Sequence, residues 1–195
     1  EPQHHKPSDN RPAIIFFFGG GWANGSPQQF EEQCRYLASR GMVAITADYR
    51  VASRQQVKAV ECVKDAKSAI RWVRTHAAEL GIDPDKIVAS GGSAGGHIAA
   101  CTGVLTEFDE PNEDLAVSTR PNAMVLFNPA VSFTPGKTDA DQKRAEQLAS
   151  RTGVPPKKIS PAEHVTKDLP PTLILIGTKD FLIDGNHEFV NKMKA

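Results

Sequence analysis

The sequence predicts an α/β protein with a doubly wound, mostly parallel sheet. Strand-like and helix-like segments alternate along the chain, which is the order that a parallel sheet requires. The strand-like segments are apolar at successive positions, as expected where helices cover both faces of a sheet. The chain has 195 residues, of which 39% are hydrophobic and 24% are charged. These values are typical of one globular domain, so the sequence predicts a single domain over residues 1–195.

Five apolar runs bounded by turn-forming residues predict the strands. The first run, residues 13–18, is the longest and has the character of a central strand. The other runs are residues 42–47, 87–90, 123–127 and 172–176. A turn over residues 83–85, with the sequence Asp-Pro-Asp, is predicted before the third run.

Apolar residues three and four positions apart predict the helices. The predicted helices are residues 27–40, residues 56–80, a run of small residues after position 93, residues 139–151, and residues from about 186 to the end. Residues 130–171 are otherwise irregular and rich in proline. This insertion is interpreted either as a small cap above the strand ends or as an irregular connection.

Charge and composition exclude several classes of partner. The chain has 23 basic and 23 acidic residues and no long basic run, which argues against binding to nucleic acid or to an anionic membrane surface. No apolar run is long enough to span a bilayer. The three cysteines lack the spacing of a metal or disulfide framework, so neither a metal nor a cofactor is expected. The sequence predicts no oligomeric state. Its compartment is equally open: a periplasmic or secreted location and a cytoplasmic one are both compatible with it.

The segment Gly91-Gly92-Ser93-Ala94-Gly95 joins a strand to a helix through a sharp turn. Such a turn forces the serine into a strained backbone conformation, so its neighbours two positions away must lack side chains. Gly91 and Gly95 satisfy this requirement. A glycine-rich turn that only packs a helix closely against a strand is the alternative interpretation.

Two further strand ends carry residues suited to the same chemistry. Gly19-Gly20-Gly21-Trp22 follows the first strand, and Asp180 follows the last. Because ligand sites of doubly wound sheets lie at the carboxyl ends of the strands, these residues are predicted to converge on Ser93. Hydrolysis of an acyl bond needs a nucleophile, N–H donors for the developing oxyanion, and an acid that orients the base.

These motifs resemble those of the α/β-hydrolase superfamily over essentially the whole chain. The similarity is to the esterase and lipase branch, which includes hormone-sensitive-lipase-like enzymes and bacterial carbohydrate acetyl or feruloyl esterases. Residues 91–97 look like its nucleophile elbow, residues 18–22 like its oxyanion loop and residues 177–180 like its acid-bearing turn. The resemblance implies a three-layer α/β/α fold and a serine carboxylic-ester hydrolase that acts through an acyl-enzyme on a small-molecule ester.

The resemblance also implies a role for each candidate residue. Ser93 is the expected nucleophile, and Gly20, Gly21 and Ala94 are the expected N–H donors to the oxyanion. Asp180 is the expected acid; Asp184 is less favoured because Asp180 directly follows the strand. Trp22 is the expected substrate-binding residue, and its size beside the small Ala94 favours short acyl chains, acetyl esters of carbohydrates among them. Phe18 stands where the branch commonly has histidine, so a changed contact within the loop is expected.

The general base is the residue that the sequence lacks. The branch places its histidine after the acid, but only 15 residues follow Asp180, and their one histidine, His187, is predicted to open a helix. His97 is expected to point along its own helix, and His76 and His164 do not match the branch pattern. The chain is therefore interpreted as a fragment, incomplete at both ends, of an esterase that needs the missing histidine for efficient turnover.

Two other functions fit the same motifs. A serine peptidase of the prolyl-oligopeptidase type uses a similar elbow. A non-catalytic binding module with the α/β-hydrolase fold would explain the missing base.

Overall fold

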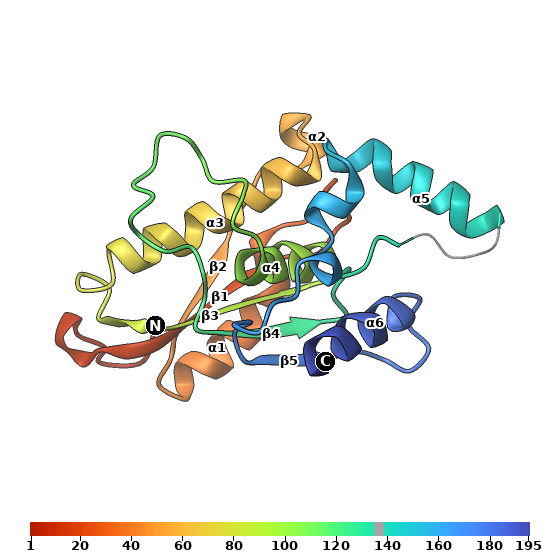
Figure 1. Ribbon diagram of the computed structural model, residues 1–195. Coiled ribbons are helices and arrows are strands. Elements are labelled where there is room, and N and C mark those ends of the chain that lie inside the picture. Colours follow the sequence, from red (N-terminus) through yellow and green to blue (C-terminus); the bar gives the residue numbers. More distant parts are fainter. Residues whose placement is uncertain (135–138) are drawn as a thin grey trace.

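The computed structural model describes residues 1–134 and 139–195 of the chain. A central parallel sheet separates two layers of helices (Figure 1). Helices α3 (Ala59–Thr75) and α4 (Ala94–Val104) lie on one side of the sheet, and α1 (Glu31–Ser39) lies on the other. This arrangement confirms the predicted doubly wound α/β class.

The sheet has five strands in the order β2-β1-β3-β4-β5, and all neighbours are parallel. Their bounds are Arg11–Phe17 for β1, Val43–Ala47 for β2, Ile82–Gly92 for β3, Ala123–Phe127 for β4 and Thr172–Leu175 for β5. The chain passes from β1 to one edge and from β3 to the other, so the direction of winding reverses between these two strands. Their carboxyl ends therefore flank the crevice where doubly wound sheets bind ligands.

Strand β3 begins earlier than predicted and includes the expected turn at residues 83–85. Arg11 pairs with Ile82, but Ala13 pairs with Ile87, so the extra residues form an irregularity in the strand pairing. The Asp85 amide donates to the Asp83 carboxylate at 2.9 Å, as in an Asx turn. The turn itself was therefore predicted correctly. The prediction that it precedes the strand was wrong, because residues on both sides of the turn pair with β1.

Helix α3 is shorter than the helix predicted over residues 56–80. Gln56 has a left-handed φ of 57°, and α3 begins only at Ala59, where the Glu61 carboxylate accepts a hydrogen bond from the Lys58 amide. The helix ends at Thr75, and residues 76–81 form a tight turn closed by a bond from the Ile82 amide to the Ala77 carbonyl. The apolar spacing continued through this turn because Ala77 is still buried in the core.

The other predicted helices differ from the observed ones mainly at their ends, and one short helix was not predicted. The predicted helix over 27–40 is a short 3₁₀ turn, Pro27–Phe30, followed by α1. A single turn, α2 (Ala52–Gln55), precedes α3, and α6 (Ile183–Lys194) starts three residues before the predicted position. Within residues 130–171 the structure has α5 (Asp139–Thr152) and two 3₁₀ turns, Pro156–Ile159 and Pro161–Glu163.

Two clusters of buried side chains hold the layers together. The larger fills the space between the sheet and α3, α4 and α6, and it includes Ile70, Ile98 and Phe189, all with no exposed surface. The smaller lies beneath α1, where the Phe16 and Phe30 rings stack with centroids 4.8 Å apart. Burying these side chains supplies the main favourable term for folding.

Strand β5 departs from the expectation that every strand is covered on both faces. Leu173 is 56% exposed and Leu175 is 45% exposed, whereas Ile174 between them packs against the larger core. The expectation was wrong for this strand because the layer containing α1 covers the opposite end of the sheet, beside β2.

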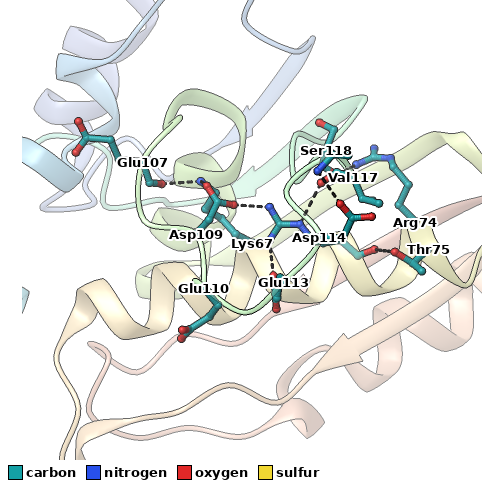
Figure 2. Close-up of polar contacts among 12 residues, drawn as sticks. Lys67, Arg74, Thr75, Glu107, Asp109, Glu110, Glu113, Asp114, Val117 and Ser118 are labelled. Atoms are coloured by element: carbon teal, nitrogen blue, oxygen red, sulfur yellow. Dashed lines mark hydrogen bonds and ion pairs between the residues drawn. The ribbon is translucent and has the colours of Figure 1, made fainter.

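An acidic loop between α4 and β4 is tied to α3 by charged side chains (Figure 2). Lys67 is 1% exposed and donates to the Glu107 carbonyl at 2.6 Å and to the Asp109 carboxylate at 2.7 Å. Arg71 pairs with Asp109 and with Glu113. The loop has no regular secondary structure, but these charged contacts attach it to α3.

No helix in the described part of the chain is long and apolar enough to cross a membrane. The same residues contain no cluster of three or more His, Cys, Asp or Glu side chains arranged to hold a metal ion. The three cysteines are free thiols, and two of them, Cys62 and Cys101, are buried and pack as small apolar side chains.

Candidate active site

Ser93 occupies the turn between β3 and α4 with φ 53° and ψ −115°. Such a conformation is rare for a residue with a side chain and costs about 1–3 kcal/mol unless its surroundings enforce it. Here three backbone hydrogen bonds enforce it. The Ser93 amide donates to the Phe127 carbonyl at 3.0 Å, and the Ser93 carbonyl accepts from the amides of His97 and Ala130. Strand β4 and the segment after it therefore hold the elbow in place.

The glycines beside Ser93 are required by close backbone contacts. A Cβ atom on Gly95 would lie 2.0 Å from the Phe17 carbonyl oxygen, and one on Gly91 would lie 2.6 Å from the same oxygen. Real Cβ atoms do not approach so closely. The contacts are made with β1, so the glycines also let α4 pack tightly on the sheet. These contacts show that the turn packs the helix against the strand, and they are compatible with a nucleophile elbow at the same place.

The glycine loop after β1 adopts left-handed conformations at Gly20 (φ 136°), Gly21 (φ 63°) and Trp22 (φ 60°). The loop passes directly beside the elbow, since a Cβ on Gly19 would be 3.4 Å from the Ser93 Cβ. The Gly19 amide donates to the Gln29 side chain at 2.5 Å. Across residues 1–134 and 139–195, the amides of Gly20 and Gly21 have no acceptor.

Ala94 supplies a third amide without an intrahelical acceptor, because it is the first residue of α4. Ser93, Ala94 and Gly21 line one cavity of about 600 Å³, whereas Gly20 does not reach its surface. The structure thus places Ser93 at one cavity with two of the three residues selected for their amides, Gly21 and Ala94. A helix amino terminus and unpaired N–H groups at the same place favour negative charge.

Phe18 makes the changed contact expected at this position. Its ring stacks on Tyr49 with centroids 4.1 Å apart, and the Tyr49 hydroxyl donates to the Phe18 carbonyl at 2.6 Å. Tyr49 and Gln29 therefore shape the glycine loop. The sequence did not indicate either contact, because Tyr49 is 31 positions from Phe18 and Gln29 is 10 positions from Gly19.

Trp22 forms part of the cavity wall, but its polar atom is directed elsewhere. The indole Nε1–H donates to Nδ1 of His97 at 3.1 Å, and Nε2 of His97 donates to the Ile159 carbonyl at 2.6 Å. The Phe133 ring lies against both, with centroids 5.0 Å from His97 and 5.9 Å from Trp22. This three-ring cluster links the glycine loop, the elbow helix and the segment after β4.

His97 is completely buried, and burial lowers its pKa to about 4, although the bond to Ile159 opposes the shift. Both ring nitrogens are occupied by the bonds to Trp22 and Ile159. His97 is therefore neutral at physiological pH and has no nitrogen free for a proton from Ser93. These contacts support the prediction that His97 is not the general base.

The other five histidines are also absent from the described lining of the cavity. His5, His76 and His164 bond to the backbone carbonyls of Leu80, Trp72 and Lys157. His187 is exposed and is the fifth residue of α6, so the prediction that it opens this helix was wrong by one turn. The helix starts earlier because Asp180 turns the chain, accepting a bond from the Leu182 amide at 2.9 Å.

Asp180 and Asp184 occupy different positions relative to Ser93. Asp180 follows β5, as predicted, and lies in a shallow depression beside Phe127 and Asn128. Asp184, in the first turn of α6, lines the cavity that contains Ser93. The Asp180 side chain is partly exposed and, among the described residues, accepts only the local bond from the Leu182 amide.

A family model, BD-FAE, matches residues 2–191 of the chain. The chain belongs to the BD-FAE family. Among solved structures, this BD-FAE protein is similar to Thermogutta terrifontis esterase 2 phosphonylated by sarin, at 50% identity, with a TM-score of 0.93. The match covers 100% of this chain and 72% of that one. The propionate-bound form of the same esterase matches at 52% identity and a TM-score of 0.91, over 100% of this chain and 71% of that one. The fold of the BD-FAE protein is therefore that of the α/β-hydrolases.

Two of the curated relatives are proteins of Mycobacterium tuberculosis. The probable carboxylic ester hydrolase LipM is 31% identical over 88% of this chain and 42% of its own length. Esterase LipC is 27% identical over 97% of this chain and 50% of its own length. The BD-FAE protein thus spans about half the length of these relatives. Membership of an esterase and lipase family, implied by the motifs, is confirmed.

Proposed function

We propose that this BD-FAE protein hydrolyses carboxylic esters through an acyl-enzyme formed on Ser93. The observation that carries the proposal is the set of unpaired amides around a strained serine. Gly21 and Ala94 line the same cavity as Ser93, and the Gly20 and Gly21 amides have no acceptor among the described residues. The esterases among the similar proteins support the same reaction class.

In the proposed reaction, the Ser93 oxygen attacks the ester carbonyl carbon and transfers its proton to a base. The carbonyl oxygen becomes an oxyanion that accepts hydrogen bonds from the amides of Gly20, Gly21 and Ala94. The carbon–oxygen bond to the alcohol then breaks, and the alcohol leaves with the proton. Water repeats the sequence on the acyl-enzyme, releasing the carboxylic acid and restoring the serine hydroxyl.

The proposed base is a histidine outside the 195 residues of this sequence. The support is that none of the six histidines belongs to the described lining of the Ser93 cavity. Asp180 is proposed to orient that histidine. Its place after β5, two strands away from the elbow at the same edge of the sheet, is compatible with this role. Without the histidine, this polypeptide alone is expected to turn over slowly.

We propose short acyl groups as the preferred substrates, with acetyl esters of carbohydrates as one class. Trp22, Phe133 and Ala94 narrow the cavity beside Ser93. The propionate-bound and butyrate-bound forms of Thermogutta terrifontis esterase 2 carry short acids and support the same preference. Residues 130–171 contribute Phe133 and part of α5 to the cavity lining, which supports their role as a small cap.

A non-catalytic binding module is the second candidate, and the lack of a histidine at the cavity favours it. The peptidase alternative has no observation in its favour. The test compares the full-length protein with its Ser93→Ala variant on p-nitrophenyl acetate, propionate and octanoate, and measures labelling by a fluorophosphonate.

We expect Ser93→Ala to lower kcat by roughly 10³-fold or more and to abolish labelling, with the acetate and propionate preferred. Labelling of Ser93 detected by mass spectrometry excludes the binding module. A variant that retains full activity contradicts the proposal, and so does a wild-type protein that neither hydrolyses the esters nor reacts with the fluorophosphonate.

A further inference from the structure

Arg151, near the carboxyl end of α5, lies at the same cavity as Ser93. Its Nη1 atom is 3.8 Å from the point that a Cβ on Gly21 would occupy, so the guanidinium sits over the glycine loop. Arg151 is the one cationic side chain among the described residues that line this cavity. A positive charge is therefore held next to the amides proposed to bind the oxyanion.

The backbone around Arg151 is fixed on both sides. The Ser150 carbonyl accepts a bond from Lys58 Nζ at 2.8 Å. Thr152 has no exposed surface, and its hydroxyl donates to the Val154 carbonyl at 2.6 Å. Gly153 has a φ of 76° and packs so closely that a Cβ there would lie 2.7 Å from that of Lys58. These contacts attach the end of α5 to the start of α3.

The guanidinium has no protein partner within the described chain. Arg50 and Arg71, by contrast, each pair with two carboxylates. The carboxylates at the cavity do not neutralise Arg151: Glu188 bonds to Ser132 and pairs with Lys192 at 2.8 Å, and Asp184 forms no ion pair with any residue that the structure describes. An arginine left unpaired beside a reaction site can give its hydrogen bonds to a ligand.

We propose that Arg151 binds a carboxylate carried by the substrate, which makes anionic esters a preferred class. The inference rests on the proposed esterase function. The planar guanidinium matches a carboxylate with two parallel hydrogen bonds, a geometry that an uncharged group of the same shape cannot use. Since Arg151 overlies Gly21, the carboxylate lies a few bonds from the scissile carbonyl, on either the acid or the alcohol part of the ester.

Two pairs of isosteric esters test the proposal, each pair exchanging a carboxylate for an isopropyl group. Monoethyl succinate against ethyl 4-methylpentanoate places the charge on the acid part. Acetoxyacetate against isobutyl acetate places it on the alcohol part. Hydrolysis of all four esters is measured with the full-length protein and its Arg151→Gln, Arg151→Lys and Lys157→Gln variants. Lys157→Gln removes one exposed charge from the same segment but outside the cavity lining.

We expect Arg151→Gln to lower kcat/KM about tenfold or more for the anionic member of one pair and less than about twofold for its neutral partner. Arg151→Lys should lower kcat/KM for the anionic ester by a smaller factor. Added salt should reduce the difference in kcat/KM between the anionic and the neutral member of the pair. Equal losses for both members, no loss for either, or the same loss in Lys157→Gln would overturn the proposal.

A binding measurement separates this inference from the proposed function. The Ser93→Ala protein, with and without Arg151→Gln, is titrated with monoethyl succinate and with acetoxyacetate by ligand-observed NMR. We expect Arg151→Gln to weaken binding of at least one anion about tenfold, whether or not the protein hydrolyses esters. Equal affinity of the two proteins for both anions overturns the assignment of Arg151 even if every neutral ester is hydrolysed. Absence of hydrolysis with the affinity difference intact contradicts the esterase proposal alone.

Discussion

Single atoms decide the shape of the elbow around Ser93. Gly91 and Gly95 are needed because the carbonyls of β1 lie where their side chains would begin. The strain typical of such turns predicts glycine at both positions, and the structure shows that the Phe17 carbonyl oxygen is the atom in contact. The sequence could not predict the bond between Trp22 and His97, because these residues are 75 positions apart.

Gly95→Ala tests the close approach of α4 to β1. A Cβ 2.0 Å from a backbone oxygen forces the helix or the strand to move, so we expect a loss of about 3 kcal/mol or more in the free energy of unfolding. Urea denaturation measures the change. Gly177→Ala is the control, since nothing lies within 4 Å of its Cβ position, and it should change stability by less than about 0.5 kcal/mol. Similar effects of the two substitutions would contradict the steric argument.

His97 should make stability depend on pH in a defined window. Its pKa is about 4 in the folded protein, below the ordinary value of 6.5, so the unfolded chain binds a proton that the folded chain does not. Stability should therefore fall as the pH drops from about 6.5 to about 4, by about 3 kcal/mol from this residue. His97→Gln can still accept from Trp22 and donate to Ile159, but it does not titrate. Urea denaturation at several pH values should give a shallower dependence for the variant, and parallel curves would refute the assignment.

At the scale of elements, the sequence defined most strands and helices, but not how they are attached. The loop after α4 has an irregular and acidic sequence that suggests a solvated connection. In the structure, Lys67 and Arg71 of α3 bind it through Asp109 (Figure 2). Hydrogen bonds from both cations lower the pKa of the Asp109 carboxyl, although burial acts in the opposite direction and more strongly than either bond alone. Lys67 and Arg71 are buried on α3, but nothing in the sequence around them indicates that they bind this loop.

Removing Asp109 should destabilise the molecule more than removing an exposed carboxylate. Asp109→Ala leaves the buried Lys67 amine and Arg71 guanidinium without a shared partner, so we expect a cost of about 3 kcal/mol. Asp48→Ala breaks an ion pair with Arg54 that is about half exposed, and should cost less than about 1 kcal/mol. Thermal or urea unfolding distinguishes the two. Equal costs would mean that the loop attachment does not contribute to stability.

At the scale of the whole molecule, one core connects both ends of the described chain. Its buried residues come from β1, α3, α4 and α6, and α6 also contacts the 3₁₀ turn Pro161–Glu163. The prediction of a single domain remains a prediction, since only unfolding measurements test it. The continuity of this core favours it.

The substitution Phe189→Ala tests whether the chain unfolds as a single domain. Phe189 has no exposed surface and belongs to the larger core, so we expect a loss of about 3–5 kcal/mol in the free energy of unfolding. Circular dichroism and tryptophan fluorescence should report the same midpoint in urea, because Trp22 and α6 share one cooperative unit. Leu115→Ala, at a 63% exposed position, should have little effect. Loss of α6 helicity ahead of the fluorescence transition would show that α6 unfolds independently.

The sequence by itself determined the parallel α/β fold, the order of the elements, the serine elbow and the glycine loop. Each of these depends on residues that are close together in the chain, so their spacing carries the information. Only the tertiary structure decided which groups meet at the cavity: that Asp184 lines it while Asp180 lines a separate depression, that the Trp22 indole bonds to His97, and that Arg151 overlies Gly21. Those contacts join segments that are distant in sequence, and they follow from how the layers pack rather than from any local pattern.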